Sequence, residues 1–290
     1  MKRSVRSFGG LNVPFNNYDS ARFVVLPVPY EKTTSYMKGA AKGPAAIIDA
    51  SRYLELYDEE LDYNPAESGI HTLKPLSVNA KPEVMISRVK ETVLRILVDG
   101  KTPIVLGGEH SITAGAVAAI RVHHGDFSIL QFDAHADLRD NYHDSRFSHA
   151  CTMARAREHA DSVQVGIRSV GVDESDLVKK LRGDGRLYFA SDILKRDCTS
   201  DIIAGLKDKV YITFDVDCLD PSIMPSTGTP EPGGLGWYQT LGIIREISRK
   251  RTVVGFDVME LMPNRQNRSP DFTAAKLTYK MIGYVNASRL

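Results

Sequence analysis

Two clusters of acidic residues in this chain are placed where they could bind metal ions. The first, Asp133 to Asp137 (Asp-Ala-His-Ala-Asp), follows the apolar run 127–132, and the second, Asp215 to Asp217 (Asp-Val-Asp), follows the apolar run 210–214. Carboxylates held this close together in a partly buried site repel one another unless a positive charge lies among them. A bound metal ion is the simplest source of that charge.

The spacing of these residues bears on how many ions they bind. An extended strand rises about 3.3 Å per residue, so Asp133 and Asp137 would lie roughly 13 Å apart on a straight strand. Either the chain turns after Asp133, or the ligands serve two ions. His110, in the run Gly-Gly-Glu-His-Ser (107–111), also follows an apolar run, 103–106. With His110, the candidate ligands are two histidines and four aspartates. Six ligands are too many for a four-coordinate structural zinc site and suit two divalent ions about 3.5 to 4 Å apart. The ligand types favour an oxygen-preferring ion such as Mn²⁺.

Each of these features has a second interpretation. An Asp-x-Asp pair after an apolar strand also occurs in phosphotransferases that bind Mg²⁺, but this chain has no Gly-rich phosphate loop. His110 could be a structural histidine whose ring bonds a backbone carbonyl. Cys151 and Cys218 lie beside functional positions, and without a partner base they are expected to be small buried residues.

Composition narrows the class of protein. The 290 residues include 37 Lys and Arg against 36 Asp and Glu, and the basic residues are scattered, so we expect neither a nucleic-acid nor a membrane surface. Three cysteines without paired spacing fit a reducing compartment. We expect a cytoplasmic protein, since no signal peptide and no membrane span of about 18 apolar residues is present. No linker divides the chain, which predicts a single domain, 1–290.

Short apolar runs alternate with helical patterns, which predicts a parallel α/β sheet with helices on both faces. The expected strands are 23–27, 103–106, 127–132, 162–167, 187–189, 210–214 and 252–256. The expected helices are 44–54, 82–99, 111–122, 149–159, 173–181, 236–248 and 272–285. Ligands collect beyond the carboxyl ends of strands in such sheets, and His110, Asp133, Asp215 and Glu260 all fall there.

These motifs together resemble the signatures of the ureohydrolase family, which contains arginases and agmatinases. The similarity runs from about Pro27 to the last expected helix, is greatest to agmatinases, and includes 148–150, 166–169, 227–234 and 256–260. It implies an arginase-like three-layer sandwich with a mainly parallel central sheet, and a homo-oligomer, either a trimer or a hexamer. It also implies two Mn²⁺ per chain, bound by His110, Asp133, His135, Asp137, Asp215 and Asp217.

The resemblance further implies three catalytic residues. Glu260 would accept hydrogen bonds from a guanidinium group, Asp137 would pass a proton to the leaving amine, and His149 would relay protons to bulk water. The non-functional alternatives are a surface carboxylate for Glu260 and a helix-start residue facing solvent for His149. His143, in the same loop, is a rival candidate for the proton relay. Glu109 is expected to support the site rather than bind metal.

The implied reaction is hydrolysis of a guanidino compound to urea and an amine by a hydroxide shared between two ions. Arg139 stands where arginases carry an asparagine, which makes arginine a doubtful substrate. An arginine side chain could still meet a carboxylate, so this departure does not exclude an acidic substrate. Agmatine, which would give putrescine for polyamine biosynthesis, is the leading expectation; guanidinobutyrate and aminopropyl-agmatine compete with it. Two other classes stay open, a metal-dependent deacetylase and a catalytically inactive metal-binding homologue.

Overall fold

The computed structural model describes residues 7–288, and eight strands in this part of the chain form one sheet. The strands are β1 (Phe23–Val28), β2 (Ile70–Thr72), β3 (Thr102–Gly107), β4 (Ser128–Phe132), β5 (Asp161–Ile167), β6 (Leu187–Phe189), β7 (Lys209–Asp215) and β8 (Thr252–Met259). Their order across the sheet is β2-β1-β3-β8-β7-β4-β5-β6, and every pairing between them is parallel. The predicted parallel sheet is confirmed.

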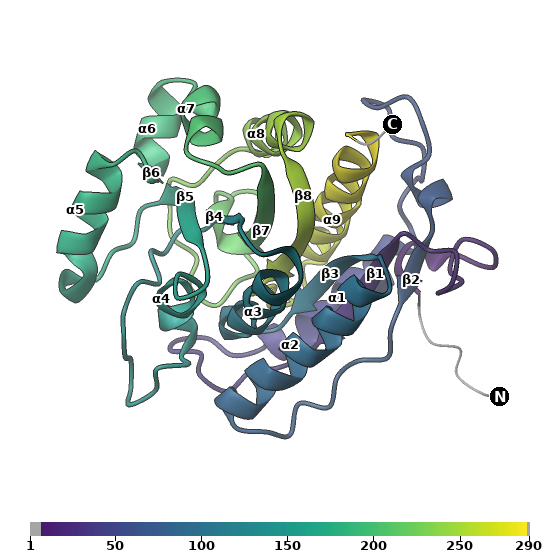
Figure 1. Ribbon diagram of the computed structural model, residues 1–290, viewed down its shortest axis with the longest axis horizontal. Helices are drawn as coiled ribbons and strands as arrows, with labels where there is room; N and C mark the ends of the chain where they lie inside the picture. Colours follow the sequence, from purple (N-terminus) through teal and green to yellow (C-terminus); the bar gives the residue numbers. More distant parts are fainter. Residues whose placement is uncertain (1–6, 289–290) are drawn as a thin grey trace.

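Helices follow most of the strands and return the chain to the other end of the sheet (Figure 1). They are α1 (Gly43–Ser51), α2 (Pro82–Val98), α3 (Thr113–His124), α4 (Thr152–Ala156), α5 (Ser175–Gly183), α6 (Ala190–Lys195), α7 (Thr199–Ala204), α8 (Trp237–Lys250) and α9 (Ser269–Ala287). Within residues 7–288 no helix combines the length and the apolar character that crossing a bilayer requires.

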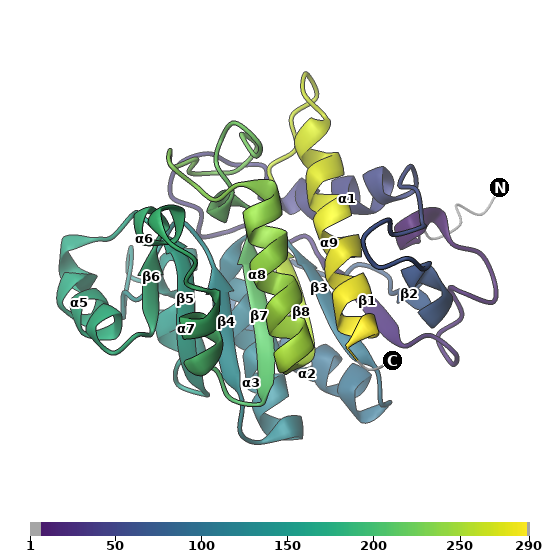
Figure 2. The same ribbon diagram turned by 90° about the horizontal axis from the view of Figure 1, so that it is seen from above.

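Two hydrophobic cores explain why the strands lack an alternating apolar and polar pattern. Phe23 and Val25 of β1 pack into a core with residues of α1, α8 and α9, whereas Val24 and Leu26 pack into a second core with residues of α2 and α3. Figure 2 shows α8 and α9 side by side across one face of the sheet. Helices therefore cover both faces of the sheet, and the predicted three-layer sandwich is confirmed.

The structure adds elements that the sequence patterns did not indicate. The edge strand β2 has only three residues, and its central His71 is half-buried, so no apolar run marks it. The helices α6 and α7 have six residues each, too few to show a helical period. The expected helix at 149–159 is shorter, because His149–Cys151 form a 3-10 turn before α4.

The four central strands place their carboxyl ends at one edge of the sheet. In order these strands are β3, β8, β7 and β4. His110 follows β3, Glu260 follows β8 directly, Asp215 ends β7, and Asp133 follows β4. Since all four strands are parallel, these side chains meet at the same rim.

Candidate metal centre and catalytic site

The first group of predicted ligands surrounds one nitrogen of a buried histidine. His110 Nδ1 lies 3.1 Å from Asp133 Oδ2, 3.3 Å from Asp215 Oδ2 and 3.6 Å from Asp137 Oδ2. The His110 side chain is 1% exposed. Three carboxylates therefore converge on one imidazole nitrogen away from water.

A second group lies beside the first and shares one aspartate with it. His135 Nδ1 lies 2.9 Å from Asp217 Oδ2 and 3.6 Å from Asp133 Oδ1. Asp133 thus directs one carboxylate oxygen to each histidine, and two clusters with metal-binding geometry share it. The structure brings together all six residues that were predicted to bind metal.

The chain turns after β4, which is one of the two arrangements that the spacing of Asp133 and Asp137 allowed. The carbonyl of Ala134 accepts hydrogen bonds from the backbone N–H groups of Arg168 (2.8 Å) and Ser169 (2.9 Å). Asp137 adopts a left-handed backbone conformation with φ 52°, and its carbonyl accepts from the N–H groups of Met153 and Ala154 at the start of α4. Because of this turn, the carboxylates of Asp133 and Asp137 both face His110 Nδ1. The predicted ligands nevertheless form two clusters, so both arrangements that the spacing allowed are present.

A hydrogen-bonded chain behind His110 fixes which of its ring nitrogens carries the proton. Thr213 Oγ1 lies 2.7 Å from His110 Nε2 and donates at 2.7 Å to Asp257 Oδ1. Because the Thr213 hydroxyl donates its hydrogen bond to the carboxylate, its oxygen accepts from His110 Nε2–H, which leaves a lone pair on Nδ1 when the ring is neutral. That lone pair faces the carboxylates, as a metal-binding histidine requires.

Asp257 and Thr213 were not among the predicted site residues. Asp257 is fully buried inside β8 and also accepts from the hydroxyls of Thr113 and Tyr211, each at 2.9 Å. The available signal was a charged residue within an otherwise apolar parallel strand, since such a residue needs partners on both sides.

The ionisable groups of the two clusters shift one another's pKa values because four carboxylates are buried together. Burial, with the negative charge of Asp133, raises the pKa of Asp137 to about 8. Burial and the charge of Asp217 raise the pKa of Asp215 well above its usual range. Burial opposes protonation of His135, yet Asp217 and Asp133 outweigh it and raise the pKa of this histidine to about 12. The cluster therefore attracts positive charge.

The donor set fits divalent cations. His110 Nδ1 is buried without a hydrogen-bond partner, although three carboxylate oxygens face it. The Nδ1 lone pair and the carboxylate oxygens are all acceptors and cannot form hydrogen bonds with one another, whereas one cation could be bound by all of them at once. Two cations would also neutralise the four carboxylates.

Glu260 lies beside the His110 cluster and is held by its backbone. Its φ of 63° is left-handed, and its N–H donates to the carbonyl of Gly108 at 2.8 Å. Its Oε1 accepts from the backbone N–H of His110 at 2.7 Å. Within residues 7–288 its Oε2 makes no hydrogen bond, so a carboxylate oxygen is left for a ligand.

His149 lies between Glu260 and the surface loop 31–39. Its Nδ1 is 3.6 Å from Glu260 Oε1 and its Nε2 is 3.2 Å from the Ser35 hydroxyl, with 16% of its side chain exposed. Burial opposes its protonation, but the bond to Glu260 outweighs burial and raises the pKa of His149. His143, the rival candidate, is exposed and packs edge-on against Tyr142.

Glu109 supports His149 through an intermediate threonine. Its carboxylate accepts from the backbone N–H groups of Lys32 (2.5 Å) and Thr33 (2.6 Å) and from the Thr33 hydroxyl (2.8 Å). Thr33 Oγ1 in turn accepts from the backbone N–H of His149 at 2.9 Å. Glu109 thereby holds the loop that borders the site.

Arg139, which stands at the position of the arginase asparagine, is engaged by other acids. Its Nε lies 3.2 Å from Asp173 Oδ1 and its Nη1 lies 3.8 Å from Glu174 Oε1. Its guanidinium also packs over the Tyr142 ring. The structure thus argues against Arg139 as a free cation for a substrate carboxylate.

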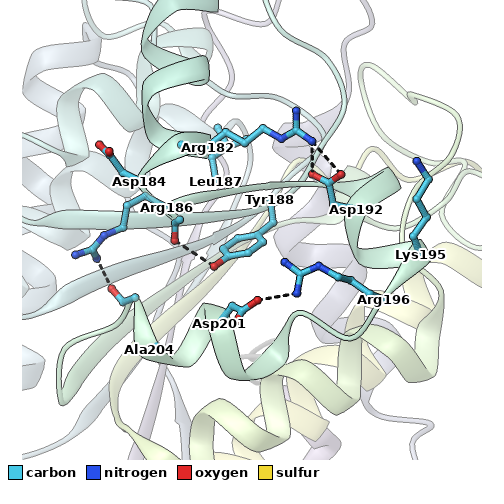
Figure 3. Close-up of a pocket in the computed structure, with 13 residues that line it drawn as sticks. Arg182, Asp184, Arg186, Leu187, Tyr188, Asp192, Lys195, Arg196, Asp201 and Ala204 are labelled. Atoms are coloured by element: carbon cyan, nitrogen blue, oxygen red, sulfur yellow. Dashed lines mark hydrogen bonds and ion pairs between the residues drawn. The ribbon is translucent and has the colours of Figure 1, made fainter.

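A separate cavity of about 760 Å³ lies along the edge strand β6 (Figure 3). Arg182 donates to both oxygens of Asp192 at 3.1 Å, and Arg196 donates to Asp201 at 2.7 Å. None of the six predicted ligands lines this cavity, and its arginines are paired within it. The ligand clusters are therefore the stronger candidate for catalysis.

Paired carboxylate and imidazole clusters at the carboxyl rim of a parallel sheet are the arrangement that two-metal hydrolases use. The chain belongs to the arginase family, whose profile matches residues 21–283. The resemblance deduced from the motifs is thereby confirmed.

Within this family, the chain is similar to proteins named ureohydrolase or agmatinase. The chain is 43% identical to N(1)-aminopropylagmatine ureohydrolase of Thermus thermophilus over 95% of its own length and 93% of the relative. It is 36% identical to agmatinase of Pyrococcus horikoshii, with 96% of each chain covered. The crystal structure of agmatine ureohydrolase from Thermoplasma volcanium superposes with a TM-score of 0.86 at 32% identity, covering 98% of this chain and 95% of that one.

Proposed function

We propose that the protein hydrolyses a guanidino compound to urea and an amine at the two clusters that share Asp133. The observation that carries the proposal is this shared aspartate, whose two oxygens face His110 and His135. Divalent ions would be held by His110, Asp133, His135, Asp137, Asp215 and Asp217. When bound, such ions neutralise the carboxylates and lower the pKa of water towards ~7.

Mn²⁺ is the proposed ion, at two per chain. The ligands offer carboxylate oxygens and imidazole nitrogens, and these suit Mn²⁺ better than a thiolate-preferring metal. Cys218 is buried near the second cluster, but its thiol donates to the carbonyl of Val165, and burial raises its pKa well above the usual range. It is therefore a packing residue.

Glu260 is proposed to bind the substrate's guanidinium. A carboxylate and a guanidinium form parallel charge-assisted hydrogen bonds, which fix orientation as well as charge. His110 N–H occupies one oxygen of Glu260 and holds the side chain in place, while Oε2 is available. The guanidinium carbon would then lie over the ligand clusters, ready for attack by water.

Protons must move during this hydrolysis. Water adds to the guanidinium carbon, the bond from carbon to the substituted nitrogen breaks, and that nitrogen leaves as an amine that has gained a proton. Asp137 is proposed to transfer that proton because its carboxylate faces the cluster. His149 would exchange protons with solvent, since it contacts both Glu260 and the hydroxyl of Ser35.

Agmatine is the first proposed substrate, because it has no carboxylate and the guanidinium of Arg139 is already paired with Asp173 and Glu174. N(1)-aminopropylagmatine is the second candidate, favoured by relatives with that name at 38 to 43% identity. Either reaction would supply an amine for polyamine biosynthesis, with putrescine as the product from agmatine. We also propose that the enzyme acts in the cytoplasm as a homotrimer or homohexamer, a state that light scattering would measure.

The test is urea release by the manganese-loaded protein. Agmatine, N(1)-aminopropylagmatine, guanidinobutyrate and arginine should be compared, with an acetylated lysine peptide as the substrate of a deacetylase. Urea from agmatine or its aminopropyl derivative supports the proposal. Acetate release without urea would indicate a deacetylase, and no turnover of any compound would indicate an inactive homologue.

A further inference from the structure

We propose that Glu231 binds the protonated amine in the tail of the substrate and so determines specificity. This inference rests on the proposed ureohydrolase function. Glu231 lies on loop 222–236, and its Oε1 is 4.0 Å from His135 Nε2. It is thus a carboxylate next to the ligand clusters that belongs to neither of them.

Exposure of the side chains indicates the direction from which a substrate enters. His110 is 1% exposed, His135 is 24% exposed, and Glu231 is 39% exposed. The site therefore opens to solvent on the side of His135. A substrate whose guanidinium is bound by Glu260 at the buried end would extend its tail past Glu231.

The backbone of Glu231 is held so that its side chain stays near the opening. Arg168 Nη2 donates to the carbonyl of Glu231 at 2.7 Å and to the carbonyl of Asp217, a predicted metal ligand, also at 2.7 Å. Asp220 Oδ2 accepts from the N–H groups of Gly233 and Gly234, each at 3.0 Å. Loop 222–236 is therefore anchored at Glu231 and just after it.

The charge of Glu231 is not neutralised by the arginine beside it. The guanidinium of Arg168 is directed to backbone carbonyls, including those of Gly166, Cys218 and Pro232. Within residues 7–288 the Glu231 carboxylate accepts no hydrogen bond. Its contact with His135 Nε2 at 4.0 Å is longer than a hydrogen bond, so both carboxylate oxygens can still accept hydrogen bonds from a cation in solution.

Glu31 and Asp140, two acids on loops that border the site, already have partners. Glu31 Oε1 accepts from the N–H groups of Gly39 (2.5 Å) and Ala40 (3.0 Å). Asp140 pairs with Arg146 at 3.3 Å and also with Arg155. Glu231 differs from these two acids, because its one ion-pair contact within residues 7–288 is with His135 Nε2 at 4.0 Å, beyond hydrogen-bond distance.

Substrate chemistry then explains what Glu231 selects. Agmatine and N(1)-aminopropylagmatine both carry a protonated nitrogen after the four-carbon chain that begins at the guanidinium. Guanidinobutyrate carries a carboxylate at its end, and arginine carries a carboxylate beside its amine. A fixed carboxylate at the opening attracts the protonated nitrogen of agmatine and N(1)-aminopropylagmatine. It repels the carboxylate of guanidinobutyrate and of arginine.

The experiment compares Glu231→Gln with the wild type on agmatine and on butylguanidine, which has the same chain without the amine. The variant should lower kcat/KM for agmatine about 10-fold, the low end for a hydrogen bond to a charged group, through KM rather than kcat. Butylguanidine should change less than about 2-fold by the same reasoning, because it has no amine to bind. Putrescine, used as a competitive inhibitor, should weaken in parallel with agmatine.

Asp144→Asn is the matched control. Asp144 is an exposed acid on the neighbouring loop with φ 59°, a backbone conformation that asparagine also adopts. This variant should keep wild-type kinetics on both substrates. Equal losses of kcat/KM for agmatine in the two variants would mean that removing any nearby negative charge weakens substrate binding. That result would overturn the assignment of Glu231.

Two further results would overturn it. A parallel loss on agmatine and butylguanidine, together with lower manganese content, would mean that Glu231 only orients His135. No change on agmatine would mean that the amine lies elsewhere. Failure of the ureohydrolase proposal itself is distinct, because the wild type would then release no urea from either compound.

Discussion

The ring of His110 and the hydroxyl of Thr213 lie 2.7 Å apart, and this contact sets the tautomer of the histidine. The Thr213 hydroxyl donates a hydrogen bond to Asp257 at 2.7 Å, so its oxygen accepts a hydrogen bond from His110 Nε2–H. The nitrogen that faces three carboxylates is consequently unprotonated when His110 is neutral. A residue inside β7 thus orients a predicted ligand that follows β3, a different strand.

Thr213→Val should weaken manganese binding by about 10- to 100-fold, the scale expected when a partner behind a metal-binding histidine is lost. Valine keeps the shape and the strand preference but leaves His110 Nε2 without an acceptor. Manganese titration by calorimetry measures the change directly. Thr213→Ser retains the hydroxyl and should bind manganese as the wild type does; equal affinities in all three proteins would refute the role of this contact.

His149→Ala should slow turnover by roughly 100-fold or more, the scale of positioned acid-base groups, while metal content stays intact. The reason is that His149 contacts Glu260 and Ser35 but none of the clustered carboxylates at hydrogen-bond distance. Steady-state kinetics and elemental analysis of the same sample check both parts. Loss of a metal ion in this variant would contradict the assignment.

Agmatine should exceed arginine in kcat/KM by at least about 100-fold, a conservative bound for a head group whose polar partners are missing. Arg139 is paired with Asp173 and Glu174, so it is not free for the carboxylate of arginine. Parallel urea assays give the ratio. If arginine were hydrolysed equally well, the agmatinase assignment would be wrong while the ureohydrolase chemistry stood.

Lys280→Met should destabilise the fold by about 3 kcal/mol, the lower end for breaking a buried ion pair. The Lys280 side chain is 3% exposed, and its ammonium lies 2.9 Å from Asp58, 3.1 Å from Glu59 and 3.3 Å from Glu60. The substitution leaves the fully buried Asp58 without this cation. Urea unfolding monitored by circular dichroism measures the difference in the free energy of unfolding.

Lys276→Met is the control for that experiment. Its ammonium lies 3.9 Å from Glu59, and its side chain is 24% exposed. A pair of this kind contributes about 0 to 1 kcal/mol. Equal destabilisation by the two substitutions would show that burial of the Lys280 pair has no special effect.

The site could be located from the sequence because ligands of parallel α/β sheets bind beyond the carboxyl ends of the strands. His110, Asp133 and Asp215 each follow or end an apolar run, and parallel strands bring such positions together. The convergence of Asp137 was predicted only through the family resemblance, because it depends on a left-handed turn at a residue other than glycine, which the spacing alone does not indicate. The position of Glu231 depends on hydrogen bonds to Arg168, which lies 63 residues away in the chain.

The supporting residues were harder to infer for a physical reason. Thr213 and Asp257 lie inside strands, where a single polar residue looks like an exception in an apolar run. Only the register of β7 against β8, which places Thr213 opposite Asp257, shows that they are partners. Sequence patterns indicate which strands exist, but the order of strands across the sheet decides such contacts.

The number of manganese ions per chain tests the central claim most directly. The protein should be stripped with a chelator, saturated with Mn²⁺, freed of excess ion and analysed for metal and protein in one sample. Two clusters that share Asp133 predict about two ions per chain, by analogy with other two-metal sites. A value that stays at one under saturating Mn²⁺ would contradict the account.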